Sequence, residues 1–546
     1  MKANLSLLLF LLGISILKVN SQCSSTVTTF QKAYGGISNE RAHSIQQTSD
    51  GGYVVAGETT SYGAGDKDIF VMKIDVNGVE QWTKTYGSTF ADDGFSITIK
   101  QTSDLGFIVS GSTNGFGAGS FDDSYIIKID NTGAIQWEKR ISGSSWDRFR
   151  DVVELANGDF LLTGSAGSYS AGNLDAHVVK ISSAGSLIWI KNLGTSFREH
   201  SQSIIELPSG NYLLSGNTNI TNNGSTNSAN SFLIKTTFDG TVIWGKQYNN
   251  STFFTDINET ILLSDGNLLN IGETRSSDGG NHDIFLLKTD TNGTVIWSKK
   301  YGGTGNDIGV NVREKTNGEL IISAFSNSYG NLNQLLLINT DAIGDIIWSK
   351  TYGGSNNDEL DWWGKPMELT TTNEIIIAGG TMSFGTGNED VYVVKTNECG
   401  ESYCNEQTVA LTTISSSATS VSFTVLTTSG GSLLNTNSIV NTISFSENVL
   451  CDSNLVSVNI LSDLNKNLNI YPNPAFNYLN VKINKGLEIQ HIEIYSVTGQ
   501  KVDTKSIDKT GESIKIDISN LNEGFYFLKV YDKNKIINTS KFFKLN

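Results

Sequence analysis

The chain has 546 residues, with 55 glycines, 4 prolines, 17% charged residues and a formal net charge of −16. This length exceeds one ordinary core, and the glycine-rich, charge-poor composition favours short strands joined by turns over long exposed helices. The negative charge argues against electrostatic binding of nucleic acid or of an anionic membrane.

The first 21 residues have the pattern of a secretory signal peptide. Lys2 supplies a positive charge, Leu5 to Leu17 is mostly apolar, and Val19 to Ser21 offers a small residue for cleavage. The apolar stretch is short for a membrane span, and no later segment is apolar enough to be one. We therefore expect removal of residues 1–21 and export of a protein without a membrane span. A retained anchor is the alternative interpretation.

A repeat of about 53 residues follows the signal peptide. In the first repeat, four strands A to D are expected near residues 42–49, 52–59, 68–75 and 79–86, with tight glycine or asparagine turns between A and B and between C and D. Four antiparallel strands in a repeat of this length predict a β-propeller blade, with a tryptophan packed between each blade and the next. Six tryptophans, spaced by 55, 52, 55, 53 and 51 residues, mark the repeat: Trp82, Trp137, Trp189, Trp244, Trp297 and Trp348.

The count of strands predicts how the ring closes. The A–B–C set occurs seven times, but a D strand follows only six of them. The segment from Phe30 to Gly36 matches the D strand from Trp82 to Ser88, so the N-terminal strand is expected to complete the last blade. Residues 27–34 should then lie beside residues 390–396. The predicted fold is all-β: a seven-bladed propeller over residues 22–404 and a C-terminal β-sandwich.

Four cysteines in an exported chain predict disulfides. Aligned on the repeat, Cys23 and Cys399 both fall at the turn between strands C and D, and they are neighbours if the ring closes. We therefore predict a Cys23–Cys399 bridge, which leaves Cys404 for Cys451. Metal binding by four cysteines so far apart is the weaker interpretation.

The repeat resembles two known groups. The segment from Lys73 to Trp82, K-x-D-x-x-G-x-x-x-W, resembles the tryptophan-docking motif of quinoprotein-like propellers. The whole blade is more similar to the Y-G-G…D-G-G-Y…W repeats of secreted bacterial proteins that use type IX secretion. The resemblance extends over about residues 25–404. It implies the architecture and almost nothing about activity, because propellers carry many unrelated functions.

Residues 405–464 change character. Serine, threonine and asparagine dominate, with short apolar runs such as Val421 to Leu426. We expect either a spacer or a small β-domain that a Cys404–Cys451 bridge completes.

Residues 465–546 resemble a type IX secretion C-terminal sorting domain of type A. Three segments carry the match: Ile470 to Pro474, Ile494 to Gly499, and Ile518 to Val530. Their alternating pattern predicts a small β-sandwich. The resemblance implies contact with the type IX machinery, passage across the outer membrane, and a secreted or surface-attached product. The sorting motif residues are Tyr471, Pro472, Asn473, Pro474, Gly499 and Gly524.

No motif for chemistry stands out. The sequence has no nucleophile elbow, phosphate loop or zinc motif, so no catalytic residue, metal site or cofactor is predicted. An aspartate begins strand C in most repeats, as at Asp68 and Asp390. We expect each of these carboxylates to accept hydrogen bonds from its own loop; calcium binding is the alternative.

Ligand recognition is expected on the face with the longer D–A and B–C loops, because loops on a rigid scaffold carry recognition. Aromatic side chains mixed with arginine and aspartate suit a sugar ring or a protein partner. The leading hypothesis is a non-catalytic binding protein for a glycan or protein. The alternatives are a polysaccharide-acting hydrolase or lyase in the propeller mouth, a structural module of a surface layer, or aromatics that only pack the loops. The candidate binding residues are Trp146, Arg148, Arg150, Arg198, His200, Phe253, Phe254, Trp362 and Trp363.

Overall fold

The alternating apolar runs and glycine turns of the sequence fold into β-strands throughout the described chain. In the computed structural model the chain divides into two compact units, one up to residue 454 and one from residue 455. Within the described ranges, no helix is long and apolar enough to cross a membrane. The structure describes residues 27–92, 96–116, 121–219, 229–249, 255–275, 281–330, 332–416, 418–453, 468–483, 491–496, 501–506, 513–532 and 535–545.

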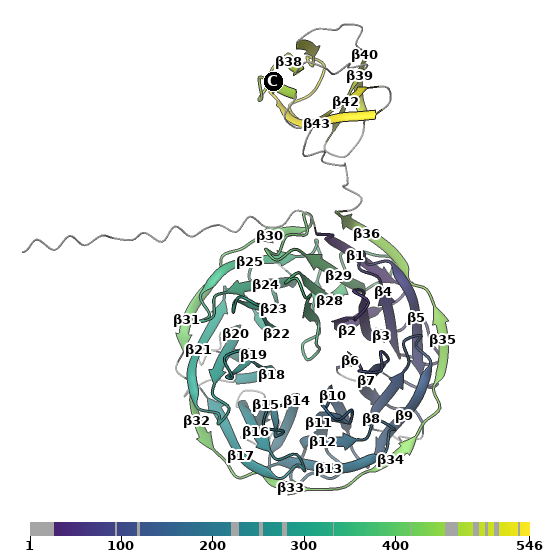
Figure 1. Ribbon diagram of the computed structural model, residues 1–546, viewed down its shortest axis with the longest axis vertical. Helices are drawn as coiled ribbons and strands as arrows, with labels where there is room; N and C mark the ends of the chain where they lie inside the picture. Colours follow the sequence, from purple (N-terminus) through teal and green to yellow (C-terminus); the bar gives the residue numbers. More distant parts are fainter. Residues whose placement is uncertain are drawn as a thin grey trace, which may run out of the picture. The chain divides into compact units, whose positions relative to one another are not determined.

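Six blades of the first unit each contain four consecutive antiparallel strands, arranged around a ring (Figure 1). Blade 1 is β2 (Glu40–Gln47), β3 (Tyr53–Thr59), β4 (Asp68–Ile74) and β5 (Glu80–Gly87); blade 2 is β6 (Thr98–Gln101), β7 (Phe107–Thr113), β8 (Asp123–Ile129) and β9 (Ile135–Ser142); blade 3 is β10 (Asp147–Glu154), β11 (Phe160–Ala166), β12 (Asp175–Ile181) and β13 (Leu187–Gly194). Blade 4 is β14 (Arg198–Glu206), β15 (Tyr212–Asn219), β16 (Ala229–Thr236) and β17 (Val242–Asn249); blade 5 is β18 (Thr255–Leu262), β19 (Leu268–Arg275), β20 (His282–Thr289) and β21 (Val295–Gly302); blade 6 is β22 (Asp307–Glu314), β23 (Leu320–Ser326), β24 (Gln334–Thr340) and β25 (Ile346–Tyr352).

Blade 7 combines the two ends of the repeat array. It contains β26 (Asp358–Glu359), β27 (Met367–Leu369), β28 (Ile375–Thr381), β29 (Asp390–Thr396) and the N-terminal β1 (Phe30–Gly35). Strand β1 pairs antiparallel with β29, from Phe30 opposite Lys395 to Tyr34 opposite Val391. The prediction that the N-terminal strand closes a seven-bladed ring is confirmed.

A tyrosine hydrogen bond repeats between blades and shows that β1 acts as a true D strand. Tyr34 of β1 donates to the carbonyl of Gly78 in blade 1 at 2.5 Å, and Phe30 packs where other blades have tryptophan. Gly78 has a φ of 74°, and a Cβ there would lie 2.8 Å from the Phe30 ring, so the contact requires glycine. Equivalent bonds join Tyr86 to Gly133, Tyr248 to Gly293, Tyr301 to Gly344, and Tyr352 to Gly400.

The repeated tryptophans and aspartates have structural roles. The Trp82 ring lies 6.3 Å from the Phe107 ring of the next blade, as expected for a residue packed between blades. The Asp68 carboxylate accepts hydrogen bonds from the backbone of Ala64 at 2.9 Å and Gly65 at 3.1 Å. The interpretation that this carboxylate stabilises its own loop is therefore confirmed.

Residues 405–452 form neither a spacer nor a separate domain. They run around the outside of the ring and add a fifth strand to every blade, so the predicted end of the propeller at residue 404 is wrong (Figure 1). We call this segment the belt. Each D strand would otherwise present an unpaired backbone edge, and the belt satisfies that edge. In chain order, its strands are β30 (Glu406–Thr408) on blade 6, β31 (Thr412–Ser416) on blade 5, β32 (Thr419–Ser422) on blade 4, β33 (Leu426–Thr428) on blade 3, β34 (Ser432–Asn435) on blade 2, β35 (Ile439–Ile443) on blade 1 and β36 (Ser446–Asp452) on blade 7.

One of the two predicted disulfides is present among the described residues. Cys404 and Cys451 are bridged, with their Cα atoms 6.3 Å apart. Cys23 lies outside the described residues, so the Cys23–Cys399 bridge stays a prediction.

The second unit is a small β-sandwich, as predicted. One sheet has the order β37 (Leu468–Tyr471), β38 (Tyr478–Ile483), β41 (Ser513–Asp517); the other has the order β40 (Lys501–Ser506), β39 (His491–Ser496), β42 (Gly524–Asp532), β43 (Lys535–Lys544). Both sheets contribute to one core, which includes Leu479, Ile494 and Leu528. Within the sorting motif, the Asn473 side chain exchanges hydrogen bonds with the backbone of Lys541 and Phe543. Gly499 lies outside the described residues.

Replacing Tyr34 by Phe tests the closure of the ring. The Gly78 carbonyl is buried in this contact, and losing its donor should lower the free energy of unfolding by about 1–2 kcal/mol. Urea unfolding followed by tryptophan fluorescence measures this. The control is Tyr471→Phe in the other unit, which should leave propeller unfolding unchanged. Equal stability of the Tyr34→Phe variant and the parent would contradict the closure.

Candidate functional site

The inner strand of blade 7 is interrupted where the inner strands of all blades converge (Figure 1). By strand register, Glu359 at the end of β26 corresponds to Arg41 of blade 1, and Met367 at the start of β27 corresponds to Ile45. Blade 1 therefore has only Ala42 to Ser44 between these two positions. In blade 7, this place is taken by Leu360 to Pro366, L-D-W-W-G-K-P, which we call the hub loop. The hub loop contains the predicted residues Trp362 and Trp363.

Backbone groups of the hub loop bond to three other blades. In blade 1, Lys365 N donates to the His43 carbonyl at 2.8 Å, and Ile45 N donates to the Lys365 carbonyl at 3.0 Å. Ser96 of blade 2 donates to the Trp363 carbonyl at 2.8 Å, and Asn311 of blade 6 donates to the Gly364 carbonyl at 3.4 Å. A Cβ at Gly364 would lie 2.1 Å from the His43 carbonyl oxygen, so this approach requires glycine.

Side chains of the hub loop reach the remaining three blades. The Arg150 guanidinium of blade 3 lies over the Trp363 ring, 4.6 Å from its centre. Lys365, which is 2% exposed, donates to the backbone carbonyls of Gln202 in blade 4 at 3.4 Å and Asn258 in blade 5 at 3.2 Å. The hub loop therefore fills the centre of the ring and joins its own blade to the six others.

Carboxylates surround the part of the mouth formed by blades 7 and 1. His43 Nδ1 lies 3.1 Å from Asp361 Oδ2. Burial lowers the pKa of His43, but the charges of Asp361 and Glu58 outweigh burial and leave the pKa above its usual value. Arg41 Nη2 lies 2.6 Å from a Glu389 oxygen. We call this the acidic side; its carboxylates are Glu58, Glu359, Asp361 and Glu389.

Arginines surround the opposite part of the mouth, on blades 3 and 4, which we call the cationic side. Arg148 forms an ion pair with Asp122. Arg150 Nη1 donates to Gln202 Oε1 at 2.6 Å, and burial lowers the pKa of Arg150 to about 10. The Nε of Arg198 is buried without a hydrogen-bond partner in the described part of the chain. The cationic side therefore brings together residues that the sequence placed in two separate D–A loops.

His200 also belongs to the cationic side, and its surroundings keep it neutral. Its Nδ1 lies 3.3 Å from the Ser165 hydroxyl of blade 3. Burial, followed by the charges of Arg150, Arg198 and Arg148, lowers the pKa of His200 to about 3. A histidine with this pKa is uncharged near neutral pH and lacks the second ring proton that a general acid would donate.

The aromatic candidates divide by exposure. Trp146 is 46% exposed and contacts Phe121 edge-on, with ring centres 5.4 Å apart. Trp362 is 36% exposed and stacks on Trp363, with ring centres 6.2 Å apart. Trp363 is covered by Trp362 and Arg150, so its contacts serve packing. Phe253 and Phe254 lie outside the described residues.

Asp256 on blade 5 is a mouth residue that the sequence analysis did not select. It is 5% exposed, and its Oδ2 accepts a hydrogen bond from Asn217 Nδ2 at 2.6 Å. Burial, and then the charge of Glu273, raise the pKa of Asp256 to about 7. The sequence held a signal for this region, because equivalent positions of four inner strands carry polar residues, His43, Arg150, Gln202 and Asn258. Within the described ranges, no three His, Cys, Asp or Glu side chains are grouped to hold a metal ion.

The two adjacent tryptophans of the hub loop should differ in their effect on stability. Trp363→Ala removes the ring beneath Arg150 and should lower the free energy of unfolding by about 3 kcal/mol. Trp362→Ala removes a more exposed ring and should cost about 1 kcal/mol or less. Thermal or urea unfolding compares them. Equal costs would contradict the role of Trp363 in holding the ring centre.

The pKa of His200 predicts a pH effect. Because its folded pKa of about 3 is below the unfolded value of about 6.5, His200 favours folding above pH 6.5, and this contribution is lost as the pH falls toward 3. Glutamine cannot gain a proton. The stability of the His200→Gln variant relative to the parent should therefore rise steadily as the pH falls from 6.5 to 4. Urea unfolding at each pH measures this; a difference independent of pH would contradict it.

Two family models match parts of the chain. Residues 469–544 match the secretion system C-terminal sorting domain, and residues 66–298 match arylsulfotransferase. The second match includes the whole cationic side. The arylsulfotransferase match is not specific for tryptophan-docking repeats. The resemblance to quinoprotein-like propellers therefore stays a prediction. No curated protein sequence matches the chain.

Several solved structures are similar at low identity. The α-L-arabinanase of Penicillium chrysogenum with bound arabinobiose has 10% identity and a TM-score of 0.39, covering 68% of this chain and 98% of its own. PorZ, a surface component of the type IX secretion system of Porphyromonas gingivalis, has 10% identity and a TM-score of 0.31, covering 94% and 75%. A puromycin hydrolase has 12% identity and a TM-score of 0.39, covering 67% and 53%. Similarity at this level says nothing about ligand or activity.

The sorting domain establishes the route of the protein. A type IX sorting domain contacts the secretion machinery and directs its chain out of the cell. The propeller is therefore exported by type IX secretion to the cell surface or the extracellular space.

Proposed function

We propose that the propeller is a non-catalytic binding protein that recognises a glycan or protein through its long-loop face, at the cationic side of the mouth. The observation that carries the proposal is the grouping of Arg148 and Arg150 on β10 with Arg198 on β14, beside the uncharged His200. Arginines grouped in this way attract anionic groups.

The charge distribution favours a ligand with anionic groups. Arginine binds carboxylate and sulfate groups through two parallel hydrogen bonds. Arg198 and His200 lie at the start of β14 on blade 4, and Arg148 is the second residue of β10 on the neighbouring blade. The chain as a whole carries a net charge of −16, so a local group of arginines selects anionic ligands against a repulsive background.

Exposed aromatic rings supply the apolar part of the proposed contact. Trp146 on blade 3 and Trp362 of the hub loop each leave more than a third of their surface exposed. A flat aromatic face beside hydrogen-bonding groups suits a sugar ring. The hub loop fills the ring centre, so a ligand approaches these rings from the long-loop face and does not pass through the ring.

An enzyme is the second candidate, and two observations favour it. Residues 66–298 match arylsulfotransferase, which supports transfer of an anionic sulfuryl group at the cationic side. A polysaccharide hydrolase or lyase would instead use the carboxyl of Asp256, whose pKa of about 7 suits a proton carrier at neutral pH. His200 is unsuited to the role of acid, because its pKa is about 3.

Glycan-array binding tests the leading proposal. The mature chain should bind glycans with carboxylate or sulfate groups, and added salt should weaken this binding. Trp146→Ala and Arg198→Ala should each weaken it at least about ten-fold. The matched control is Phe238→Ala, which removes an aromatic ring that is 68% exposed on a C–D turn of the opposite face. Binding that survives Arg198→Ala, or falls equally with Phe238→Ala, would contradict the proposed site.

Product analysis separates the enzyme from the binding protein. Incubation with acidic polysaccharides or with an aryl sulfate and a phenolic acceptor should give no turnover if the protein only binds. Turnover that disappears in Asp256→Asn would favour the hydrolase or lyase, and sulfate transfer that disappears in Arg198→Ala would favour the transferase.

A further inference from the structure

The belt begins and ends at neighbouring blades after passing every blade of the ring. Its first strand, β30, pairs with β25 of blade 6, and its last strand, β36, pairs with β1 of blade 7. The disulfide joins Cys404, just before β30, to Cys451 in β36. The belt and the disulfide therefore form one covalent loop around the propeller. We infer that this disulfide is a redox-controlled clasp, whose closure locks the belt onto all seven blades and whose reduction releases it.

The separate attachments of the belt are weak. Its strands β30 and β33 have three residues each and pair with a D strand at three positions. Most belt side chains are exposed or half-buried, including Ile414 and Val421, which are 53% and 58% exposed. Short strands fray from their ends, although the belt also packs a few apolar side chains on the blades, such as Leu411, Val425 and Phe445. Joining the two ends removes the places where fraying begins, so the clasp makes seven weak attachments act together.

The clasp also lies over the closure of the ring. Gln31 of β1 is fully buried; its Nε2 donates to Ser402 Oγ at 2.7 Å and to the Cys404 carbonyl, and its Oε1 accepts from Tyr392 of β29 at 2.6 Å. Thr29 and Ser453 exchange two hydrogen bonds of 2.8 Å beyond the end of β36. Strands β29, β1 and β36 are therefore held together where the belt ends.

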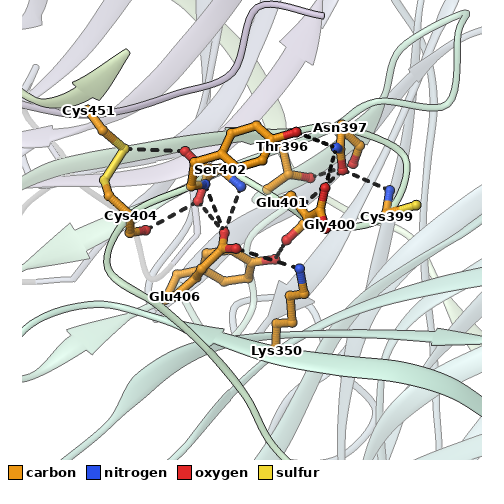
Figure 2. Close-up of polar contacts among 12 residues, drawn as sticks. Lys350, Thr396, Asn397, Cys399, Gly400, Glu401, Ser402, Cys404, Glu406 and Cys451 are labelled. Carbon is orange, nitrogen blue, oxygen red and sulfur yellow. Dashed lines mark hydrogen bonds and ion pairs between the residues drawn. A yellow bond between two sulfur atoms is a disulfide. The ribbon is translucent and has the colours of Figure 1, made fainter. Parts of the chain in front are cut away.

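Figure 2 shows how the first residues of the belt are anchored beside the clasp. Glu406 Oε2 accepts from the backbone N of Ser402 at 2.6 Å and from the Ser402 hydroxyl at 2.8 Å. Glu406 Oε1 lies 3.6 Å from Lys350 Nζ of blade 6. The Cys451 sulfur lies 3.4 Å from the Ser402 carbonyl. These contacts hold the first end of the belt, whereas the other end is tied to it through the sulfur bridge.

Opening the clasp is a two-electron reduction. A dithiol reductant breaks the bond between the Cys404 and Cys451 sulfurs, each of which takes up one electron and one proton to become a thiol, and the reductant leaves as its own disulfide. Both cysteines are half-buried, so a small reductant in solution reaches them. An oxidising extracellular environment keeps the clasp closed.

Hydrogen exchange measured by mass spectrometry tests the clasp on the mature chain, before and after reduction with dithiothreitol. Strand β33 pairs with β13 of blade 3, whereas the clasp joins blades 6 and 7, so β33 reports release far from the sulfurs. We expect exchange at β33 to become at least about ten-fold faster on reduction, together with β31, β32, β34 and β35. Strands within a blade, such as β19 between β18 and β20, should keep their protection.

Two cysteine variants make the result specific. In Cys404→Ser/Cys451→Ser, the belt should exchange fast without reductant. In Cys23→Ser/Cys399→Ser, which keeps the clasp, the belt should respond to reductant as in the parent. If the first variant does not fold, reduction of the folded parent and of the second variant still decides the question. Unchanged protection of β33 after complete reduction, or loss of protection in β19 together with the belt, would overturn the inference.

Discussion

The pairing of β1 with β29 is the constraint on which the rest of the propeller depends. The first described strand of the chain must find a partner more than 350 residues later, at Lys395 to Val391, before blade 7 has its fourth strand. Tyr34 and Phe30 then repeat the contact that other blades make through tyrosine and tryptophan. Because a propeller blade buries both faces of its sheet against neighbours, an unclosed ring would leave the faces of blades 1 and 7 exposed to water. Contacts between such distant segments form slowly, so closure is the demanding step for this fold.

Two segments outside the repeat reinforce this closure from opposite sides. At the axis, the hub loop extends from blade 7 and contacts the inner strands of the other six blades, with Lys365 and Trp363 as its main side chains. At the circumference, the belt pairs with the D strand of every blade and finishes on β1 itself. Both segments need the ring in its final geometry, since each contacts blades that are distant in sequence. They therefore stabilise the closed ring, because an open ring would not offer the surface on which each segment lies.

The sequence predicted what the repeat itself encodes and missed what departs from it. Regular spacing of tryptophan and of glycine turns was enough for the blades, because each blade uses the same side chains in the same places. The belt could not be recognised in this way, because its strands pair through backbone hydrogen bonds, which any Ser- or Thr-rich sequence can make, and its few packed apolar side chains follow no repeat. The Cys404–Cys451 pairing was correctly predicted, but its consequence, a closed loop around the ring, follows only from the path of the chain. Trp362 and Trp363 were noticed as a departure from the repeat, although only the structure shows that Trp363 faces Arg150 at the axis.

The mouth shows how nearly identical blades acquire different chemistry. The second position of the inner strand is Arg41 in blade 1, Arg148 in blade 3, Asp256 in blade 5 and Glu359 in blade 7. Since the framework is the same in each blade, one substitution per blade changes the local charge without changing the backbone. The result is an acidic side and a cationic side within one rim, and the pKa of His200 falls to about 3 while that of Asp256 rises to about 7. A rigid ring keeps these opposed groups apart, because collapse of the two sides onto each other would require the inner strands to leave the hub loop. The polarity of the mouth is thus a consequence of ring closure.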